Sequence, residues 1–130
     1  MHLETTARSL GQQGELTAQY WCGRHELDVL ATNQRAKDSL EEIDIIARDL
    51  TTSEIVFIEV KARSHTSMGW PEEAVNTSKQ EKIRRVALEW LERQRIEHPG
   101  FGYPDLRFDV IALVGQPATG FAIKHYRGVF

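Results

Sequence analysis

The spacing of apolar positions predicts two helices in this chain. Over residues 5–23, small and apolar side chains recur every three or four positions and form one stripe along a helix. Ser78 and Glu81 fit a capping box, so a second helix is expected to begin there and to end at His98-Pro99-Gly100. Its apolar side chains recur with a strong amphipathic period, at Ile83, Val86, Ala87, Trp90 and Leu91.

Two glycines, Gly11 and Gly14, lie inside the first predicted helix. Each weakens a helix by roughly 1 kcal/mol relative to alanine, so their presence needs a reason. We expect another element of the fold to approach this face closely.

Five other segments predict strands: residues 27–35, 42–47, 55–63, 106–114 and 121–126. Ile55-Val56-Phe57-Ile58 is apolar on both faces, which is typical of a buried central strand. After it, Glu59, Lys61 and Arg63 occupy one face while the other face stays apolar. The order helix, three strands, helix, two strands indicates an α/β or α+β domain whose first three strands can form a meander.

Length and composition favour one domain spanning residues 1–130. The chain has 130 residues and a mass of 14.9 kDa, 41% of its residues are hydrophobic, and it contains no repeat or linker-like tract. Its longest apolar run, Val110–Val114, is too short to cross a bilayer, and no apolar block near the N-terminus predicts a signal peptide. The single cysteine, Cys22, excludes an internal disulfide and a cysteine-rich zinc site. We therefore expect a cytoplasmic protein that contacts no membrane.

Charge is distributed unevenly along the chain, although the formal net charge is only −3. Residues 1–60 carry five Lys and Arg against eleven Asp and Glu, whereas residues 61–95 carry eight against five. A site that collects carboxylates beside a basic segment is one interpretation, and two solvated faces of opposite sign is the other. Net charge therefore does not exclude a nucleic-acid partner.

The clearest chemical pattern combines Asp44 with Glu59 and Lys61. Glu59 and Lys61 are two positions apart on a predicted strand and point to the same side. If Thr51-Thr52 forms the loop of a hairpin, the register places Asp44 opposite Glu59. Opposed side chains have Cβ atoms about 5 Å apart, so the two carboxylates repel unless a cation such as Mg²⁺ lies between them. Lys61 would then stand beside the metal.

Two interpretations of this pattern are open on the residues alone. In one, Glu59 and Lys61 form a surface ion pair of roughly 0–1 kcal/mol and Asp44 is solvated. In the other, a divalent cation held by the carboxylates polarises a phosphodiester and lowers the pKa of a bound water, which the lysine orients. The charged residues end the most hydrophobic strand, where solvated charges are least expected, and this weakens the interpretation as a surface pair without deciding between the two.

These residues resemble a known nuclease motif. Asp44 with Glu59-Val60-Lys61 is similar to the PD-(D/E)XK motif of restriction-endonuclease-like nucleases, whose core archaeal Holliday-junction resolvases share. Residues 8–126 resemble the YraN family of small bacterial proteins. Glu41 and Leu16 depart from its pattern, which usually has glycine and an acid there. The matching segments are Gly11-x-x-Gly14-Glu15, Asn33-x-Arg35, Glu42-Ile43-Asp44-Ile45-Ile46-Ala47, Phe57-Ile58-Glu59-Val60-Lys61-x-Arg63, Gly69, Ala74-Val75, Lys79-Gln80 and Arg107-Phe108-Asp109-Val110.

The resemblance implies a restriction-endonuclease-like α/β fold, in which a mixed central sheet is flanked by helices. It also implies Mg²⁺- or Mn²⁺-dependent hydrolysis of DNA phosphodiester bonds, with branched or recombination intermediates as candidate substrates. It implies that Asp44 and Glu59 are catalytic metal ligands and that Lys61 is the catalytic lysine. It also implies that Glu15 is a further acidic ligand, whereas on the residues alone Glu15 would cap or solvate its helix. The backbone carbonyl of Val60 is a common additional ligand in this superfamily.

Basic residues near the motif are candidates for nucleic-acid binding. They are Arg63, Lys79, Lys82 and Arg85. Lys79 and Lys82 lie near the first turn of the second helix, where the helix dipole disfavours cations. Phosphate binding is one explanation for that placement, and a solvated polar face is the other. DNA is the expected partner rather than RNA, and the sequence does not decide between a monomer and a homodimer.

Other charged residues are expected to pair within the fold. Glu42, on the same face as the motif aspartate, is expected to pair with Arg35 or Arg63, with metal ligation as the alternative. Arg107 and Asp109 share a strand face and are expected to pair with each other. The rival to a nuclease is a non-catalytic nucleic-acid-binding or assembly protein that keeps the fold. The joint presence of the aspartate, glutamate and lysine of the motif favours the nuclease.

Overall fold

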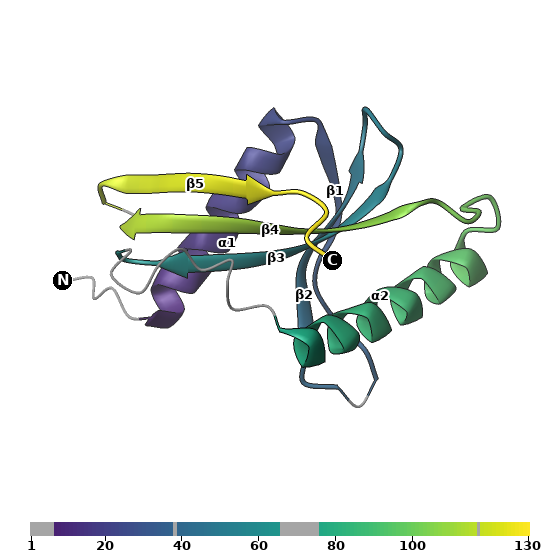
Figure 1. The fold of residues 1–130 in the computed structure, drawn as a ribbon. Helices are drawn as coiled ribbons and strands as arrows, with labels where there is room; N and C mark the ends of the chain where they lie inside the picture. The colour runs from purple at the N-terminus through teal and green to yellow at the C-terminus, as the bar shows by residue number, and fades with distance from the viewer. Residues whose placement is uncertain (1–6, 38, 66–75, 117) are drawn as a thin grey trace.

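A five-stranded mixed sheet lies between two helices in the computed structural model (Figure 1). The structure describes residues 7–37, 39–65, 76–116 and 118–130. The elements are α1 (Ala7–Arg24), β1 (Leu27–Arg35), β2 (Glu42–Asp49), β3 (Ile55–Arg63), α2 (Thr77–Glu97), β4 (Leu106–Gln116) and β5 (Gly120–Tyr126). The strands follow one another across the sheet in chain order, from β1 to β5.

The strand directions confirm the expected fold class. β1, β2 and β3 pair antiparallel and form the meander, β3 and β4 are parallel, and β5 returns antiparallel to β4. A parallel pair needs a crossover connection, and α2 supplies it. In Figure 1, α1 crosses behind β3 and β4, while α2 lies in front of β2. The result is an α/β domain with a mixed sheet, consistent with a restriction-endonuclease-like fold.

Two apolar clusters, one on each face of the sheet, hold the layers together. α1 packs Ala18 and Cys22 against one face, which includes Ile45 and Ile111. α2 packs all of its predicted apolar side chains against the other face, around Phe57. Fully burying a large apolar side chain stabilises a fold by about 1.5–3 kcal/mol. β3 supplies side chains to both clusters, as its two-faced apolar run predicts.

A close approach between α1 and β3 explains one of the two helix glycines. A Cβ atom built on Gly14 would lie 2.7 Å from the Cβ of Ala62, closer than side-chain atoms normally come. Only glycine lets the helix backbone lie this near the strand. Around Gly11, the described residues leave such a Cβ nothing within 4 Å. The expected close approach is therefore confirmed at Gly14 and wrong at Gly11.

The start of α2 differs from the prediction. The Asn76 side chain accepts a hydrogen bond from the Lys79 N–H at 2.9 Å, which makes Asn76 the N-cap. Asn76 has the extended backbone that a cap requires, whereas Ser78 is already inside the helix. The predicted capping box at Ser78 is therefore wrong. The predicted end is confirmed, because His98 is the C-cap.

The hairpin between β2 and β3 has the predicted register but a longer loop. Its ladder includes the pair Ile45–Ile58, which the predicted hairpin also gives. The turn closes where the Asp49 N–H donates to the Glu54 carbonyl at 2.9 Å, so the loop is wider than Thr51-Thr52 alone. The Asp49 carboxylate accepts hydrogen bonds from the amides inside the loop and so fixes its wider shape.

The length and composition of the two helices in the described part of the chain show whether either could cross a membrane. Neither α1 nor α2 combines the length and the apolar character that a bilayer span requires. Both instead pack apolar side chains against the sheet.

Candidate active site

The candidate site forms where β2 and β3 move apart. Their ladder ends at the pair Ile45–Ile58, so the predicted pairing of Asp44 with Glu59 is not part of it. Continuing the register would also bring Ile43 opposite Val60. The Val60 N–H instead donates to Oδ2 of Asp44 at 2.7 Å. The aspartate side chain thus takes the place of a ladder partner and satisfies a backbone group that the divergence would otherwise leave unpaired. Asp44 is in this way attached to the strand that carries the rest of the motif.

Glu59 contacts two lysines through one carboxylate oxygen. Its Oε1 lies 3.1 Å from Nζ of Lys61 and 2.9 Å from Nζ of Lys79. Lys61 is its neighbour on β3, whereas Lys79 comes from the first turn of α2. The glutamate is only 9% exposed. An internal carboxylate therefore accounts for the position of Lys79 at the helix end that disfavours cations.

The second oxygen of Glu59 is buried without a donor. Its Oε2 is inaccessible to solvent, and none of the described residues gives it a hydrogen bond. Leaving a buried acceptor unpaired costs roughly 1–3 kcal/mol, and native proteins rarely do so without a reason. This oxygen is free to bind a ligand that carries positive charge.

Glu15 from α1 meets Asp44 from β2. Their carboxyl groups share a hydrogen bond, and ligand oxygens of Glu15, Glu42 and Asp44 all lie within 4.8 Å of one another. Burial and the charge of Glu59 raise the pKa of Asp44 to about 8, and burial also raises the pKa of Glu15. Acids crowded in this way either keep a proton near neutral pH or bind a cation in its place. Glu59 is not a member of this group of close oxygens. We refer to Glu15, Glu42 and Asp44, together with Glu59 on the adjacent strand, as the acidic site.

Both oxygens of Glu42 have partners on β1. Arg35 Nε donates to Oε2 at 3.1 Å, which confirms the predicted ion pair with Arg35. The side-chain amide of Asn33, assigned with its nitrogen toward the acid, donates to Oε1 at 2.9 Å. Sequence reasoning assigned Asn33 no role. The signal that could have found it is an asparagine within a strand, since asparagine tolerates a positive φ, and here φ is 52°.

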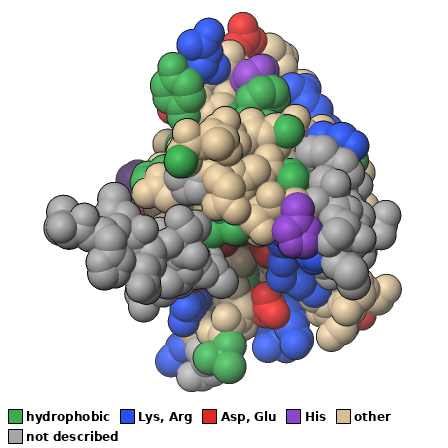
Figure 2. Space-filling view, turned by 90° about the vertical axis from the view of Figure 1, so that its left-hand side faces the viewer, with side chains coloured by type: hydrophobic (Ala, Val, Ile, Leu, Met, Phe, Trp, Pro, Cys, Tyr) green, Lys and Arg blue, Asp and Glu red, His purple; other side chains and the backbone are tan. Residues whose placement is uncertain are grey.

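The remaining predicted nucleic-acid contacts are exposed side chains on two elements. Lys82 and Arg85 lie on α2, where Arg85 lines a surface groove together with Glu81 and Glu89. Arg63 ends β3 and lines a cavity of about 260 Å³. On the face drawn in Figure 2, Lys and Arg side chains lie beside acidic ones in the lower half of the view. Contact of these residues with nucleic acid stays a prediction.

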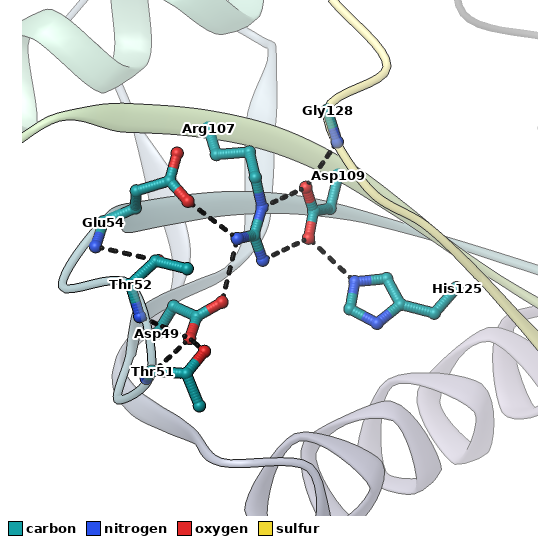
Figure 3. A network of polar contacts seen from close by, with 8 residues as sticks. All are labelled: Asp49, Thr51, Thr52, Glu54, Arg107, Asp109, His125 and Gly128. Carbon is teal, nitrogen blue, oxygen red and sulfur yellow. Dashed lines mark hydrogen bonds and ion pairs between the residues drawn. The ribbon is translucent and has the colours of Figure 1, made fainter.

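A second polar cluster, the Arg107 network, joins β4 to the β2–β3 turn and to β5 (Figure 3). Arg107 donates to Asp49 at 2.8 Å and to Glu54 at 2.9 Å, and it holds both oxygens of Asp109 at 3.0 and 3.1 Å. His125 Nε2 lies 2.7 Å from Asp109 Oδ2. The network confirms that Arg107 and Asp109 pair within the fold.

Comparison with known proteins identifies the family. The family model described as "Uncharacterised protein family UPF0102" matches residues 14–113. The chain belongs to this family. The UPF0102 protein of Beutenbergia cavernae is 37% identical over 121 residues, which cover 93% of this chain and 95% of the relative. That of Geotalea daltonii is 37% identical over 123 residues, covering 95% and 90%, and that of Desulfitobacterium hafniense is 39% identical over 113 residues, covering 87% of each.

Membership of UPF0102 confirms the resemblance to the YraN family. The matched residues include the whole acidic site and both lysines that contact Glu59. The names of these relatives state no activity, so the nuclease chemistry is not decided by family membership. Gly69 and Ala74-Val75, which belong to the family pattern, lie outside the described residues.

Proposed function

We propose that this UPF0102 protein is a divalent-metal-dependent nuclease that hydrolyses phosphodiester bonds of DNA. The observation that carries the proposal is the asymmetry of Glu59. One of its oxygens contacts two lysines, and the other is buried with no donor among the described residues. Asp44 is close enough for the charge of Glu59 to raise its pKa. Glu59 thus has protein cations at one oxygen and, at the other, a buried acceptor without a donor among the described residues.

The residues fit a hard cation such as Mg²⁺ or Mn²⁺. Every candidate side-chain ligand is a carboxylate oxygen, and Asp44, Glu15 and the unpartnered oxygen of Glu59 would hold the ion. When bound, such an ion supplies Lewis-acid stabilisation of the phosphate and a water of lowered pKa. Burial and the repulsion among the acids raise the pKa of Asp44 in the metal-free protein, and this repulsion favours binding of any divalent cation there.

Lys61 and Lys79 would act on the substrate from the other side of Glu59. Their shared contact with Oε1 fixes where both ammonium groups lie. Lys61 orients the attacking water and stabilises the negative charge that develops on it. Lys79 binds an oxygen of the scissile phosphate, and the N-terminus of α2 adds to the attraction because helix N-termini favour anions.

DNA is proposed as the substrate, with branched or recombination intermediates as the structures to try first. The resemblance to the archaeal resolvases supports this choice. Lys82 and Arg85, exposed on the same helix as Lys79, offer further cations to a phosphate backbone that approaches the site.

A cleavage screen with matched variants tests the proposal. The wild-type protein is incubated with linear, nicked, four-way-branched and single-stranded DNA in Mg²⁺, Mn²⁺ or EDTA, and cleavage is expected only with the metals. Lys61→Ala should lower the cleavage rate roughly 100-fold or more while calorimetric Mn²⁺ binding and DNA affinity are kept. Asp44→Ala and Glu59→Ala should each lose saturable Mn²⁺ binding.

Lys82→Ala is the matched control, a lysine close to Lys79 on the exposed side of α2. It should weaken DNA binding and reduce the slope of its salt dependence by about one unit. Cleavage of DNA once bound should be unchanged. If no DNA or RNA is cleaved, and Lys61→Ala and Lys82→Ala lose affinity equally, the protein is a nucleic-acid-binding module instead.

A further inference from the structure

We propose that Asn33 is a positioning residue that holds Glu15 in the acidic site and so sets the affinity of that site for its metal ion. The inference rests on the proposed function, because it assigns Asn33 a part in the same metal site. It concerns a residue that touches neither the metal nor the substrate and that acts through Glu15.

The side-chain amide of Asn33 bridges two acids from different elements. With its donor end turned toward the acids, its nitrogen lies 3.2 Å from Oε2 of Glu15 on α1 and 2.9 Å from Oε1 of Glu42 on β2. We assign this orientation because an ionised carboxylate accepts hydrogen bonds and cannot donate them, so the amide nitrogen and both acids are then satisfied. One asparagine therefore links β1 to both neighbouring acids.

Glu42 serves as the anchor of this link. Its other oxygen, Oε2, accepts from Arg35 Nε at 3.1 Å, so both oxygens of Glu42 are engaged by β1. Glu42 is part of the acidic site by distance, yet these contacts favour a role in holding Asn33 over direct metal ligation. The chain of contacts runs from Arg35 through Glu42 and Asn33 to Glu15.

The backbone explains why this position carries asparagine. Thr32 and Gln34 pair regularly with β2, whereas Asn33 between them has a φ of 52°, in the left-handed region. Asparagine tolerates this conformation better than most residues, and glycine is the other common choice. Of these two, asparagine also supplies the donor that the acids need.

Glu15 needs such support because its other partner is itself an acid. Ligand oxygens of Glu15, Glu42 and Asp44 all lie within 4.8 Å of one another. Carboxylates this close repel one another, which drives Glu15 away from the other two. A neutral donor held by β1 keeps the carboxylate in place without adding a competing positive charge.

Calorimetric titration with Mn²⁺ tests the inference through a double-mutant cycle. Asn33→Gly removes the amide while suiting the positive φ, and it should raise the Mn²⁺ dissociation constant roughly 10-fold. This is the lower end of the effect of losing a residue that orients a metal ligand, because Asn33 is exposed. In a Glu15→Gln background, Asn33→Gly should cause no further change, because Asn33 acts through Glu15.

Ser53→Gly is the control, since Ser53 also has a positive φ, in the β2–β3 turn, and its substitution should leave Mn²⁺ affinity unchanged. Two results overturn the inference while wild-type metal binding, and with it the proposed function, stands. One is an unchanged dissociation constant in Asn33→Gly, and the other is an equal loss with and without Glu15. Failure of the wild-type protein to bind Mn²⁺ overturns the proposed metal chemistry and this inference together.

Discussion

The acidic site and the Arg107 network differ in the hydrogen-bond partners that surround their carboxylates. In the network, both oxygens of Asp49 and of Asp109 accept hydrogen bonds. In the acidic site, Asp44 meets another acid, and Glu59 keeps an oxygen with no donor among the described residues. Both regions contain several carboxylates, so the supply of donors makes the difference. Acids with full sets of donors hold the fold together, and acids without them are available to a ligand.

The pKa values of the carboxyl groups differ between the two regions for the same reason. Burial alone would raise the pKa of Asp49, but hydrogen bonds from Thr51 and Arg107 hold it below its usual range. Burial acts in the same way on Asp109, whose pKa is likewise lowered by His125 and Arg107. At Asp44, burial and the charge of Glu59 act together and raise the pKa to about 8. Burial is common to both regions, so the partners decide the direction.

Replacing Arg107, the cation of the network, is expected to have the largest effect on the free energy of unfolding. Arg107→Met leaves Asp49 and Asp109 buried without their main partner, so the free energy of unfolding should fall by about 3–5 kcal/mol. Urea denaturation measures the loss. Arg35→Met is the matched control, because the Arg35 side chain is 58% exposed in its pair with Glu42 and should contribute less than about 1 kcal/mol. Equal losses in the two variants would contradict the distinction between the regions.

The same substitution made in both regions should have smaller effects of different sign. Asp109→Asn turns an amide NH₂ toward Arg107 or His125, so the free energy of unfolding should fall by about 2–3 kcal/mol. Asp44→Asn keeps an oxygen for the Val60 N–H and removes a repelling charge. The metal-free protein should then be as stable as wild type or up to about 1 kcal/mol more stable. Urea denaturation in EDTA at pH 8 compares them, and a loss of several kcal/mol in Asp44→Asn would make Asp44 a structural residue.

A change of one pH unit should give the smallest change in the free energy of unfolding for each titrating carboxyl group. Asp49 and Asp109 have folded pKa values below the unfolded value near 3.9, so their stabilisation is complete above that pH. It is lost as the pH falls toward the folded values, by at most about 1.4 kcal/mol per pH unit and carboxyl group. Asp44 has a raised folded pKa, so its contribution is present at low pH and declines as the pH rises toward 8.

Urea denaturation of the metal-free wild type and of Asp44→Asn at pH 3, 5, 7 and 8 separates these two dependences of stability on pH. The loss below pH 4 should appear in both proteins, because the Arg107 network is intact in each. The decline between pH 5 and pH 8 should be shallower in Asp44→Asn. An unchanged decline would show that Asp44 does not carry the raised pKa.

Local patterns were enough to predict most of the regular structure. β1 and β3 begin and end where the sequence predicts, and α2 buries all five predicted apolar side chains. Side-chain alternation and helical periodicity are properties of neighbouring residues, so they can be read without the fold. The pair Arg107–Asp109 was predictable for the same reason, since its members lie two positions apart on one strand. The cap of α2 was not, because Asn76 and Ser78 both suit a cap and only the backbone chooses between them.

The sequence by itself determined that an aspartate and a Glu-x-Lys pair lie at the ends of adjacent antiparallel strands, whose register it also gave through pairs such as Ile45–Ile58. Tertiary structure alone decided what surrounds them. Lys79 reaches Glu59 because the crossover helix begins beside β3, and Asn33 faces Glu15 because β1 adopts a positive φ next to α1. These contacts join residues that are distant in the chain, and their geometry depends on how the helices pack on the sheet. Periodicity specifies which face of an element is buried, but not which polar groups meet at its ends.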